Sequence, residues 1–291
     1  MMNLPCPLVS TEWLLENIEN PNLIIFDTSV HLAHKEGGGY LPTSGRENFI
    51  KTHIPGAQFI DLIEELSCPN TDIPFTMPDP TRLADILKGY GVDDQSLVIL
   101  YNDGIPMWST RAWWMIRSIG LESVSVLDGG WKKWHAEGKP VSDQTTSREP
   151  SKTLTIEPDP SFWADKDIML ENIDTGMACT INALSPEIFS GEKNQYGRPG
   201  HIPGSHNVFY GDLINQSDGT FVAAETVREK FELIDALGEK PVIAYCGGGI
   251  SATMDAMMLF QLGKMDVAVY DGSMSEWIRD PNLPLNLGEA P

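Results

Sequence analysis

The stretch PVIAYCGGGISAT, residues 241–253, decides how the rest of the chain is interpreted. An apolar run typical of a buried strand ends at Cys246, three glycines follow, and the next residues suit the start of a helix. Backbone N–H groups converge in such a loop and the helix N-terminus adds partial positive charge, so both favour a thiolate. The stretch therefore predicts an α/β fold with a reactive cysteine at the carboxyl end of a strand.

The length and charge of the chain limit its class. The chain has 291 residues, of which 41% are hydrophobic, enough for two domains and too many for a disordered chain. The formal net charge of −21 repels nucleic acid and anionic membranes, so neither is an expected partner.

The four cysteines, Cys6, Cys68, Cys179 and Cys246, are scattered without a CxxC pair or a histidine at zinc-ligand spacing. They predict free thiols in a reducing compartment, with no metal site and no disulfide scaffold. The first ten residues lack a secretory pattern, and no apolar run approaches the length of a membrane span. We expect a cytoplasmic protein without a cofactor, in which the first three of these cysteines are structural.

Hydrophobic patterns predict short strands that alternate with helices. Strands are expected at residues 23–27, 97–101, 124–127, 178–183, 242–245 and 267–270. Helices are expected at residues 11–18, 81–90, 109–120 and 161–173, and a long loop at residues 30–47. This alternation predicts mostly parallel sheets covered by helices on both faces.

The order of these elements repeats once. Residues 53–57, HIPGA, return as residues 201–205, HIPGS, and residues 124–129 return as residues 267–272. Matched segments in one order indicate a duplicated α/β domain. We expect a first domain at residues 1–140, a linker at residues 141–160 rich in Pro, Ser and Thr, and a second domain at residues 161–291.

The two copies differ at the carboxyl end of one strand. The first copy has Asn102 and Asp103 after Tyr101, where the second has Cys246 and Gly247 after Tyr245. An Asn-Asp pair cannot perform thiolate chemistry, so the first domain is expected to be catalytically inactive. Its expected role is to form one wall of the cleft at the active site of the second domain.

Five motifs resemble the two-domain rhodanese-type sulfurtransferases, which include thiosulfate and 3-mercaptopyruvate enzymes. They are HIPGA at 53–57, LDGG at 127–130, GHIPG at 200–204, CGGGIS at 246–251 and YDGS at 270–273. The resemblance implies two tandem rhodanese-like domains, a persulfide on Cys246 and an inactive first domain. It also implies small-molecule sulfur donors and acceptors, with a thioredoxin-like or other thiol reductant as a further partner.

The sequence departs from this family at several positions. The loop is uncharged, which is closer to the 3-mercaptopyruvate branch, but Gly248 stands where that branch has a serine. Leu184 stands where the branch has an arginine, and a leucine cannot hold a carboxylate. The relay histidine of the branch would match His53. These departures leave the donor, thiosulfate or 3-mercaptopyruvate, undecided.

Sulfur transfer requires a thiolate that attacks sulfur and then holds it as a persulfide, so the loop has to favour the ionised cysteine. The alternative for Cys246 is a buried structural thiol. The Ser251 hydroxyl can donate to the sulfur or cap the following helix. Five backbone N–H groups are expected to point inward and favour the thiolate, those of Gly247, Gly248, Gly249, Ile250 and Ser251. The first four of these residues are candidates for substrate binding, and Ser251 is a catalytic candidate together with Cys246.

Two residues outside the loop are further candidates. Arg198 could bind the anionic end of the donor, or it could be a surface arginine paired with a local acid. His53 could contribute a proton from the first domain, but His201 repeats it, so a structural role in the turn is favoured. Residues 37–39, three glycines, are interpreted as a flexible loop rather than a phosphate site.

Two other functions compete with sulfur transfer. A phosphatase loop of this kind needs an arginine six positions after the cysteine, where this chain has Ala252, so phosphoryl chemistry is disfavoured. A non-catalytic persulfide carrier is the second alternative. The sequence favours an enzyme that moves sulfur from thiosulfate or 3-mercaptopyruvate to cyanide, a thiol or another thiophilic acceptor.

Overall fold

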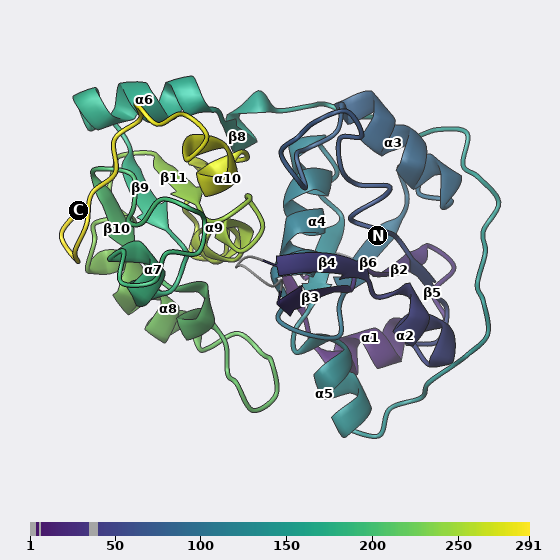
Figure 1. Ribbon diagram of the computed structural model, residues 1–291. Helices are drawn as coiled ribbons and strands as arrows, with labels where there is room; N and C mark the ends of the chain where they lie inside the picture. Colours follow the sequence, from purple (N-terminus) through teal and green to yellow (C-terminus); the bar gives the residue numbers. More distant parts are fainter. Residues whose placement is uncertain (1–3, 6, 35–39) are drawn as a thin grey trace.

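The computed structural model describes residues 4, 5, 7–34 and 40–291, which form two α/β domains side by side (Figure 1). The predictions for Cys6 and for residues 37–39 lie outside the described residues. Within the described ranges, no helix is long and apolar enough to cross a bilayer.

The first domain is built on a parallel sheet of five strands in the order β1-β7-β6-β2-β5. The strands are β1 (Leu8–Val9), β2 (Leu23–Asp27), β5 (Ala57–Phe59), β6 (Leu97–Tyr101) and β7 (Val124–Leu127). The flanking helices are α1 (Thr11–Asn17), α2 (Arg46–Lys51), α3 (Pro80–Gly89), α4 (Met107–Ser118) and α5 (Gly130–Ala136). Every residue of β2 and β6 is buried, as expected for central strands covered on both faces.

The second domain repeats this arrangement with the strand order β8-β12-β11-β9-β10. Its strands are β8 (Trp163–Ala164), β9 (Cys179–Asn182), β10 (Ser205–Asn207), β11 (Val242–Tyr245) and β12 (Val267–Tyr270). Its helices are α6 (Lys166–Thr175), α7 (Pro186–Phe189), α8 (Ala224–Glu232), α9 (Ala252–Gln261) and α10 (Ser273–Trp277). The predicted duplication and the predicted parallel sheets are therefore confirmed at the level of topology.

Two sequence predictions of local structure are wrong. The described part of residues 30–47 is not a loop, because β3 (Val30–His34) and β4 (Tyr40–Ser44) pair as an antiparallel hairpin before α2. Residues 161–173 are not one helix: Trp163 and Ala164 pair with β12 as the edge strand β8. Helix α6 starts only after Asp165, whose Oδ1 accepts the Ile168 N–H at 2.9 Å.

The domains are joined by close packing of α4 against α9. The hydroxyls of Thr110 and Thr253 hydrogen-bond across this contact at 2.8 Å, and the rings of Trp113 and Phe260 lie 5.3 Å apart. One hydrophobic core contains buried residues from both sheets and from both helices. The cleft between the domains is therefore held by a packed interface rather than by the connecting segment alone.

The connecting segment lies against the first domain over residues 142–159 and follows its outer side in Figure 1. Ser142 and His53 exchange two backbone hydrogen bonds of 2.8 and 2.9 Å. Further along, the Ser151 N–H donates to the Lys88 carbonyl, and the Asp159 N–H donates to the Ser118 carbonyl at the end of α4. We call residues 142–159 the strap.

Candidate active site

Cys246 follows β11 directly and lies between this strand and α9, as the sequence predicts. Its side chain is only 2% exposed, and it lines a cavity of about 860 Å³ between the two domains. Gly247, Gly248, Ile250 and Ser251 line the same cavity. The structure thus brings together most of the loop residues that the sequence singled out.

Four of the five loop N–H groups named above have no protein acceptor among the described residues. They belong to Gly247, Gly248, Ile250 and Ser251, and they remain available to a ligand at the cavity. The prediction for Gly249 is wrong, because its N–H donates to Ser273 Oγ at 3.0 Å. Ser251 stands at the start of α9, yet its side chain makes no capping hydrogen bond with any described residue, so its hydroxyl can donate into the cavity.

Ser273 fixes the loop from behind, a role that the sequence reasoning missed. Its Oγ accepts the N–H groups of Cys246 at 3.1 Å and Gly249 at 3.0 Å, and it donates to the Tyr270 carbonyl at 2.7 Å. Ser273 has φ +48°, a left-handed conformation that disfavours side chains. The internal repeat marks this position, because Ser273 matches Gly130 of the first domain. Gly130 has φ +51°, so both domains need a left-handed residue here, and a glycine is the residue that usually adopts it.

Two tyrosines close the space above the loop. A Cβ atom placed on Gly247 would lie 2.0 Å from the Tyr196 hydroxyl oxygen, so any other residue at this position would displace the Tyr196 side chain. Burial and the neighbouring Cys246 raise the pKa of Tyr196, and burial followed by Tyr40 and Cys246 raises that of Tyr210. Both tyrosines therefore keep their protons at neutral pH and can act as hydrogen-bond donors in the cavity.

Arg111 supports the loop from the first domain. Its fully buried guanidinium donates to the carbonyls of Gly249 at 3.1 Å and Phe75 at 2.7 Å, and it pairs with Asp271 at 2.6 Å. It also stacks over the ring of Trp163, at 4.7 Å from the centroid. This one side chain joins α4 to the cysteine loop, and the sequence reasoning did not single it out.

The structure corrects the donor-binding role predicted for Arg198. Its guanidinium donates to the backbone carbonyls of Asp280 at 2.9 Å and Leu283 at 2.7 Å, and Arg198 does not line the cavity. Because its N–H groups bond these two carbonyls, the Arg198 guanidinium stabilises the segment after α10 and has a structural role.

Substitution of Arg198 should affect the stability of the protein rather than donor binding. For Arg198→Ala we expect a loss of about 1–3 kcal/mol in the free energy of unfolding, because two carbonyls lose their donors. The donor KM should change by less than about twofold. Urea unfolding measures the free energy of unfolding, and initial-rate kinetics measure the donor KM. A large rise in KM with unchanged stability would show that Arg198 binds the donor.

His53 also lies outside the cavity. Its ring bonds the carbonyls of Phe49 at 2.7 Å and Gln144 at 3.2 Å, and stacks on Phe49 at 4.0 Å. His201 does the same in the second domain, with Phe189 at 2.9 Å and Ala290 at 3.1 Å. The duplicated contacts support the structural alternative for His53.

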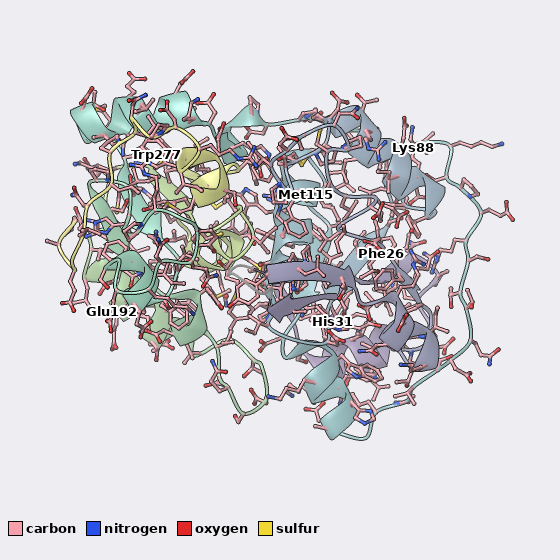
Figure 2. All side chains as sticks on the ribbon, viewed as in Figure 1. Phe26, His31, Lys88, Met115, Glu192 and Trp277 are labelled. Carbon is pink, nitrogen blue, oxygen red and sulfur yellow. The ribbon has the colours of Figure 1, made fainter. Side chains whose placement is uncertain are left out.

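Charged groups are few on the cavity wall. Lys193 lines it from the second domain. From the first domain, His31 Nε2 lies 2.7 Å from Asp103 Oδ2, and both residues line the cavity. Figure 2 shows His31 on the hairpin strand β3, near the middle of the molecule. The rest of the wall is largely apolar and aromatic, with Phe75, Trp108, Leu184, Phe209 and Tyr210 among its residues.

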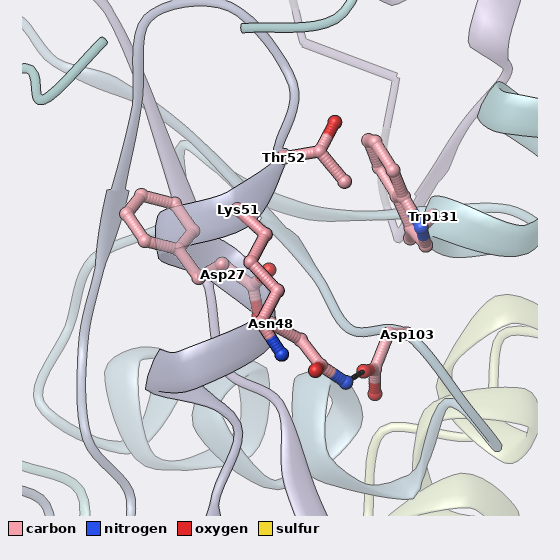
Figure 3. A pocket seen from close by; sticks show the side chains of 7 residues that line it. Asp27, Asn48, Lys51, Thr52, Asp103 and Trp131 are labelled. Atoms are coloured by element: carbon pink, nitrogen blue, oxygen red, sulfur yellow. Dashed lines mark hydrogen bonds between the residues drawn. The ribbon is translucent and has the colours of Figure 1, made fainter. Parts of the chain in front are cut away.

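A smaller pocket of about 160 Å³ lies in the first domain at the matching end of its sheet (Figure 3). Asp27 and Asp103 line it, together with Lys51 and Trp131, and Asn48 donates to Asp103 at 3.4 Å. Burial raises the pKa of Asp27 to about 6. No thiol lines this pocket, and within the described chain no group of three His, Cys, Asp or Glu side chains could hold a metal ion.

Asp255 is a buried acid in α9 that the site does not use. It is fully buried, and neither carboxyl oxygen has a hydrogen-bond partner among the described residues. Burial raises the pKa of Asp255 well above its ordinary value. The folded protein therefore favours the neutral acid, while the unfolded chain releases the proton near pH ~4.

The stability contributed by neutral Asp255 should be lost as the pH rises. Above pH ~4, and up to the raised native pKa, unfolding releases a proton, so the free energy of unfolding falls by up to about 1.4 kcal/mol per pH unit. Asp255→Asn cannot ionise, so this variant should lack that part of the fall and be more stable than the parent at alkaline pH. Urea midpoints across the pH range test this, with exposed Asp174→Asn as control, and parallel curves for parent and Asp255→Asn would contradict it.

Comparison with known proteins gives concordant results. The model of the rhodanese-like domain family matches residues 10–137 and 190–280. The 3-mercaptopyruvate sulfurtransferase of Mus musculus is 34% identical over 93% of this chain and 91% of that protein. The thiosulfate sulfurtransferase of Mus musculus is 32% identical over 94% of this chain and 92% of that protein.

A solved structure is similar over nearly the whole chain. The crystal structure of SseA from Escherichia coli, described among 3-mercaptopyruvate sulfotransferases with the rhodanese fold, superposes with a TM-score of 0.80 at 28% identity. The match covers 91% of this chain and 98% of that one. The two-domain architecture expected from the motifs is confirmed by this likeness.

Proposed function

Since the chain belongs to the rhodanese family and is a sulfurtransferase, we propose that Cys246 is its nucleophile and carries the sulfur as a persulfide. The thiolate attacks the transferable sulfur of the donor, and the rest of the donor leaves with its electron pair. An acceptor nucleophile then attacks the outer sulfur and releases the Cys246 thiolate. The cycle is a two-step, ping-pong transfer.

The observation that carries this proposal is the set of free N–H groups around a buried thiol. Gly247, Gly248, Ile250 and Ser251 offer backbone donors without a protein acceptor in the described chain, at the cavity that Cys246 lines. Such donors stabilise a thiolate or an anionic persulfide without a charged side chain. The Ser251 hydroxyl supplies a further donor in the same proposal.

The first domain is proposed to be catalytically inactive and to complete the active site of the second domain by forming part of the cavity wall and supporting the cysteine loop. It contributes cavity wall, and its Arg111 bonds the Gly249 carbonyl, but its matching loop carries Asn102 in place of the thiol. The proposed boundaries are residues 1–140 for this domain, 141–160 for the linker and 161–291 for the second domain.

The proposed donors are thiosulfate and 3-mercaptopyruvate, and the proposed acceptors are cyanide or thiols, with a thioredoxin-like or other thiol reductant as partner. Similar proteins bear both names, so the names do not choose between the donors. The proposed compartment is a reducing, cytoplasmic one, although a similar Arabidopsis thaliana protein is named mitochondrial.

Intact-mass analysis tests the function. The protein is exposed to each donor separately, freed of excess donor and weighed, and the modified residue is located by peptide mapping. One added sulfur atom on Cys246 is the expected result for at least one donor, followed by its loss on addition of cyanide. No added sulfur with either donor, or sulfur found on Cys68 or Cys179 alone, would overturn the assignment.

A further inference from the structure

The first domain has a small polar pocket of its own, which we call the first-domain pocket (Figure 3). Side chains with charge or aromatic character line it, among them Asp27, Lys51, Asp103 and Trp131. Its volume of about 160 Å³ equals that of about five water molecules, well below the space that a drug-sized ligand fills. A ligand of this pocket is therefore a small molecule, and the charged groups on the wall define its chemistry.

Two carboxylates lie close together on this wall. Asp27 is only 4% exposed, and its Oδ1 accepts the Ser29 N–H at 2.8 Å. Asp103 Oδ2 bonds His31 at 2.7 Å and Asn48 at 3.4 Å, whereas Asp103 Oδ1 has no hydrogen-bond partner among the described residues. Burial, followed by the charge of Asp103, raises the pKa of Asp27 to about 6. The repulsion between the two carboxylates favours a ligand that brings a positive group to them.

A cation and an indole ring complete the wall. Lys51 is exposed at the end of α2 and makes no ion pair with any described residue. In Figure 3 its side chain extends toward Asn48 and Asp103, and Trp131 stands on the other side of the view. The ring of Trp131 is partly exposed and adds apolar surface. Negative charge, positive charge and an aromatic face thus meet in one small space.

The catalytic domain has uncharged residues at the positions that match the two carboxylates. Asp27 and Asn182 each pair with the tyrosine that ends the central strand, and each accepts the N–H two residues further on. The hydroxyl of that tyrosine also interacts with the Asp27 or Asn182 side chain. An amide therefore suffices for the structural contacts at this position, and Asp27 adds only charge. Asp103 likewise stands where the second domain has Gly247.

We propose that the first-domain pocket binds a small α-amino acid as its zwitterion. The ammonium group lies between Asp27 and Asp103, the carboxylate accepts hydrogen bonds from Lys51, and the short side chain packs on Trp131. Among the described residues, this site shares only Asp103 with the cavity at Cys246. Binding involves no transfer of sulfur, so the inference goes beyond the proposed function.

Calorimetric titration of the full chain with L-alanine measures this binding, at pH ~8, where Asp27 is ionised. We expect a dissociation constant on the order of 1 mM or lower. Ethylamine keeps only the ammonium group and propionate only the carboxylate. Each should bind at least about tenfold more weakly, because it loses one charge-assisted contact. L-Tryptophan has both charges but a side chain too large for the pocket, so it should also bind at least about tenfold more weakly.

NMR spectra of the ¹⁵N-labelled full chain locate the bound L-alanine. We expect its addition to move the backbone amide signals of residues 27, 48–52, 103 and 131, which line or adjoin the first-domain pocket. The signals of residues 246–251, in the cysteine loop, should stay in place. Changes centred on residues 246–251 would put L-alanine in the catalytic cavity and overturn the inference.

Matched variants test the two charges. Asp27→Asn gives the first domain the residue type that the second domain has at the matching position, so the fold should persist. We expect Asp27→Asn and Lys51→Gln each to weaken the binding of L-alanine about tenfold. Asp174→Asn and Lys152→Gln remove the same charges from exposed residues outside the pocket and should leave binding unchanged.

Three results of the titrations would overturn this inference. They are the absence of L-alanine binding, ethylamine binding as tightly as L-alanine, and Asp27→Asn or Lys51→Gln binding L-alanine like its control variant. If Lys51 instead neutralises Asp103 within the pocket, Lys51→Gln would strengthen the binding of ethylamine and leave that of L-alanine unchanged, which would also overturn it. None of these measurements depends on sulfur transfer, so failure of the proposed function would leave this inference standing.

Discussion

The Cys246→Ser protein is expected to lose sulfur transfer by at least about a thousandfold, because the reaction loses its nucleophile. A serine hydroxyl does not ionise at neutral pH even among free N–H donors, and it cannot hold an outer sulfur as a persulfide. The measurement is turnover with thiosulfate and with 3-mercaptopyruvate, together with the intact mass after donor exposure. Because Cys246 is buried and serine is slightly smaller, the fold should persist.

Cys179→Ser is the matched control for this experiment. Cys179 is half-buried, its Sγ lies 3.7 Å from the Ile234 carbonyl oxygen, and it does not line the cavity. Burial, followed by the nearby Asp235, raises the pKa of Cys179 to about 11, so it remains a thiol at neutral pH. This variant should keep most of the activity. If both variants lost activity equally, or if Cys246→Ser still transferred sulfur, Cys246 would not be the nucleophile.

Arg111→Ala is expected to cost about 3–5 kcal/mol in the free energy of unfolding. The substitution leaves the Asp271 carboxylate without its cation in a mostly buried setting, and it removes donors from the carbonyls of Gly249 and Phe75. Because Gly249 belongs to the cysteine loop, transfer activity should fall even at temperatures where the variant is folded. Urea unfolding and donor kinetics on the same preparation measure both effects.

Two further variants test whether the effects of Arg111→Ala come from the loss of the buried guanidinium rather than from the loss of any arginine. Arg111→Lys keeps the charge but not the planar set of donors, so it should recover only part of the stability. Arg82→Ala, at an exposed position of α3, should change stability by less than about 0.5 kcal/mol. A loss as small for Arg111→Ala as for Arg82→Ala would mean that the buried pair does not hold the domains together.

The fold was largely predictable because its signals are local and occur twice. Apolar runs such as residues 97–101 and 242–245 mark central strands, and each repeats at the same place in its domain. The hairpin β3–β4 was missed because its mostly exposed strands contain polar residues and Pro42 and lack hydrophobic periodicity. These strands form because they pair with each other, which the sequence pattern does not show. Edge strand β8 was missed because two residues paired with β12 leave almost no pattern.

The site was predictable only within the cysteine loop. There, the chemistry follows from adjacent residues, and Cys246 and Ser251 do line the cavity. Arg198 and Lys193 are five residues apart, and which of them reaches the cavity depends on the path of an irregular segment. Arg111 acts through contacts with distant parts of the chain, so no spacing rule could assign it, and Ser273 is marked in the sequence only by its match with Gly130 in the internal repeat.

The strap has a consequence for motion between the domains. A flexible tether would allow the domains to hinge apart and admit substrate through the opened gap. Here the Asp159 N–H bonds the Ser118 carbonyl, and the Trp114 indole N–H donates to the Phe162 carbonyl at 3.0 Å, directly before β8, so almost no free chain is left to act as a hinge. Substrate access should therefore depend on movement of side chains that line the cavity, among them His31, Leu32 and Tyr40 of the hairpin β3–β4, while the two halves stay fixed relative to each other.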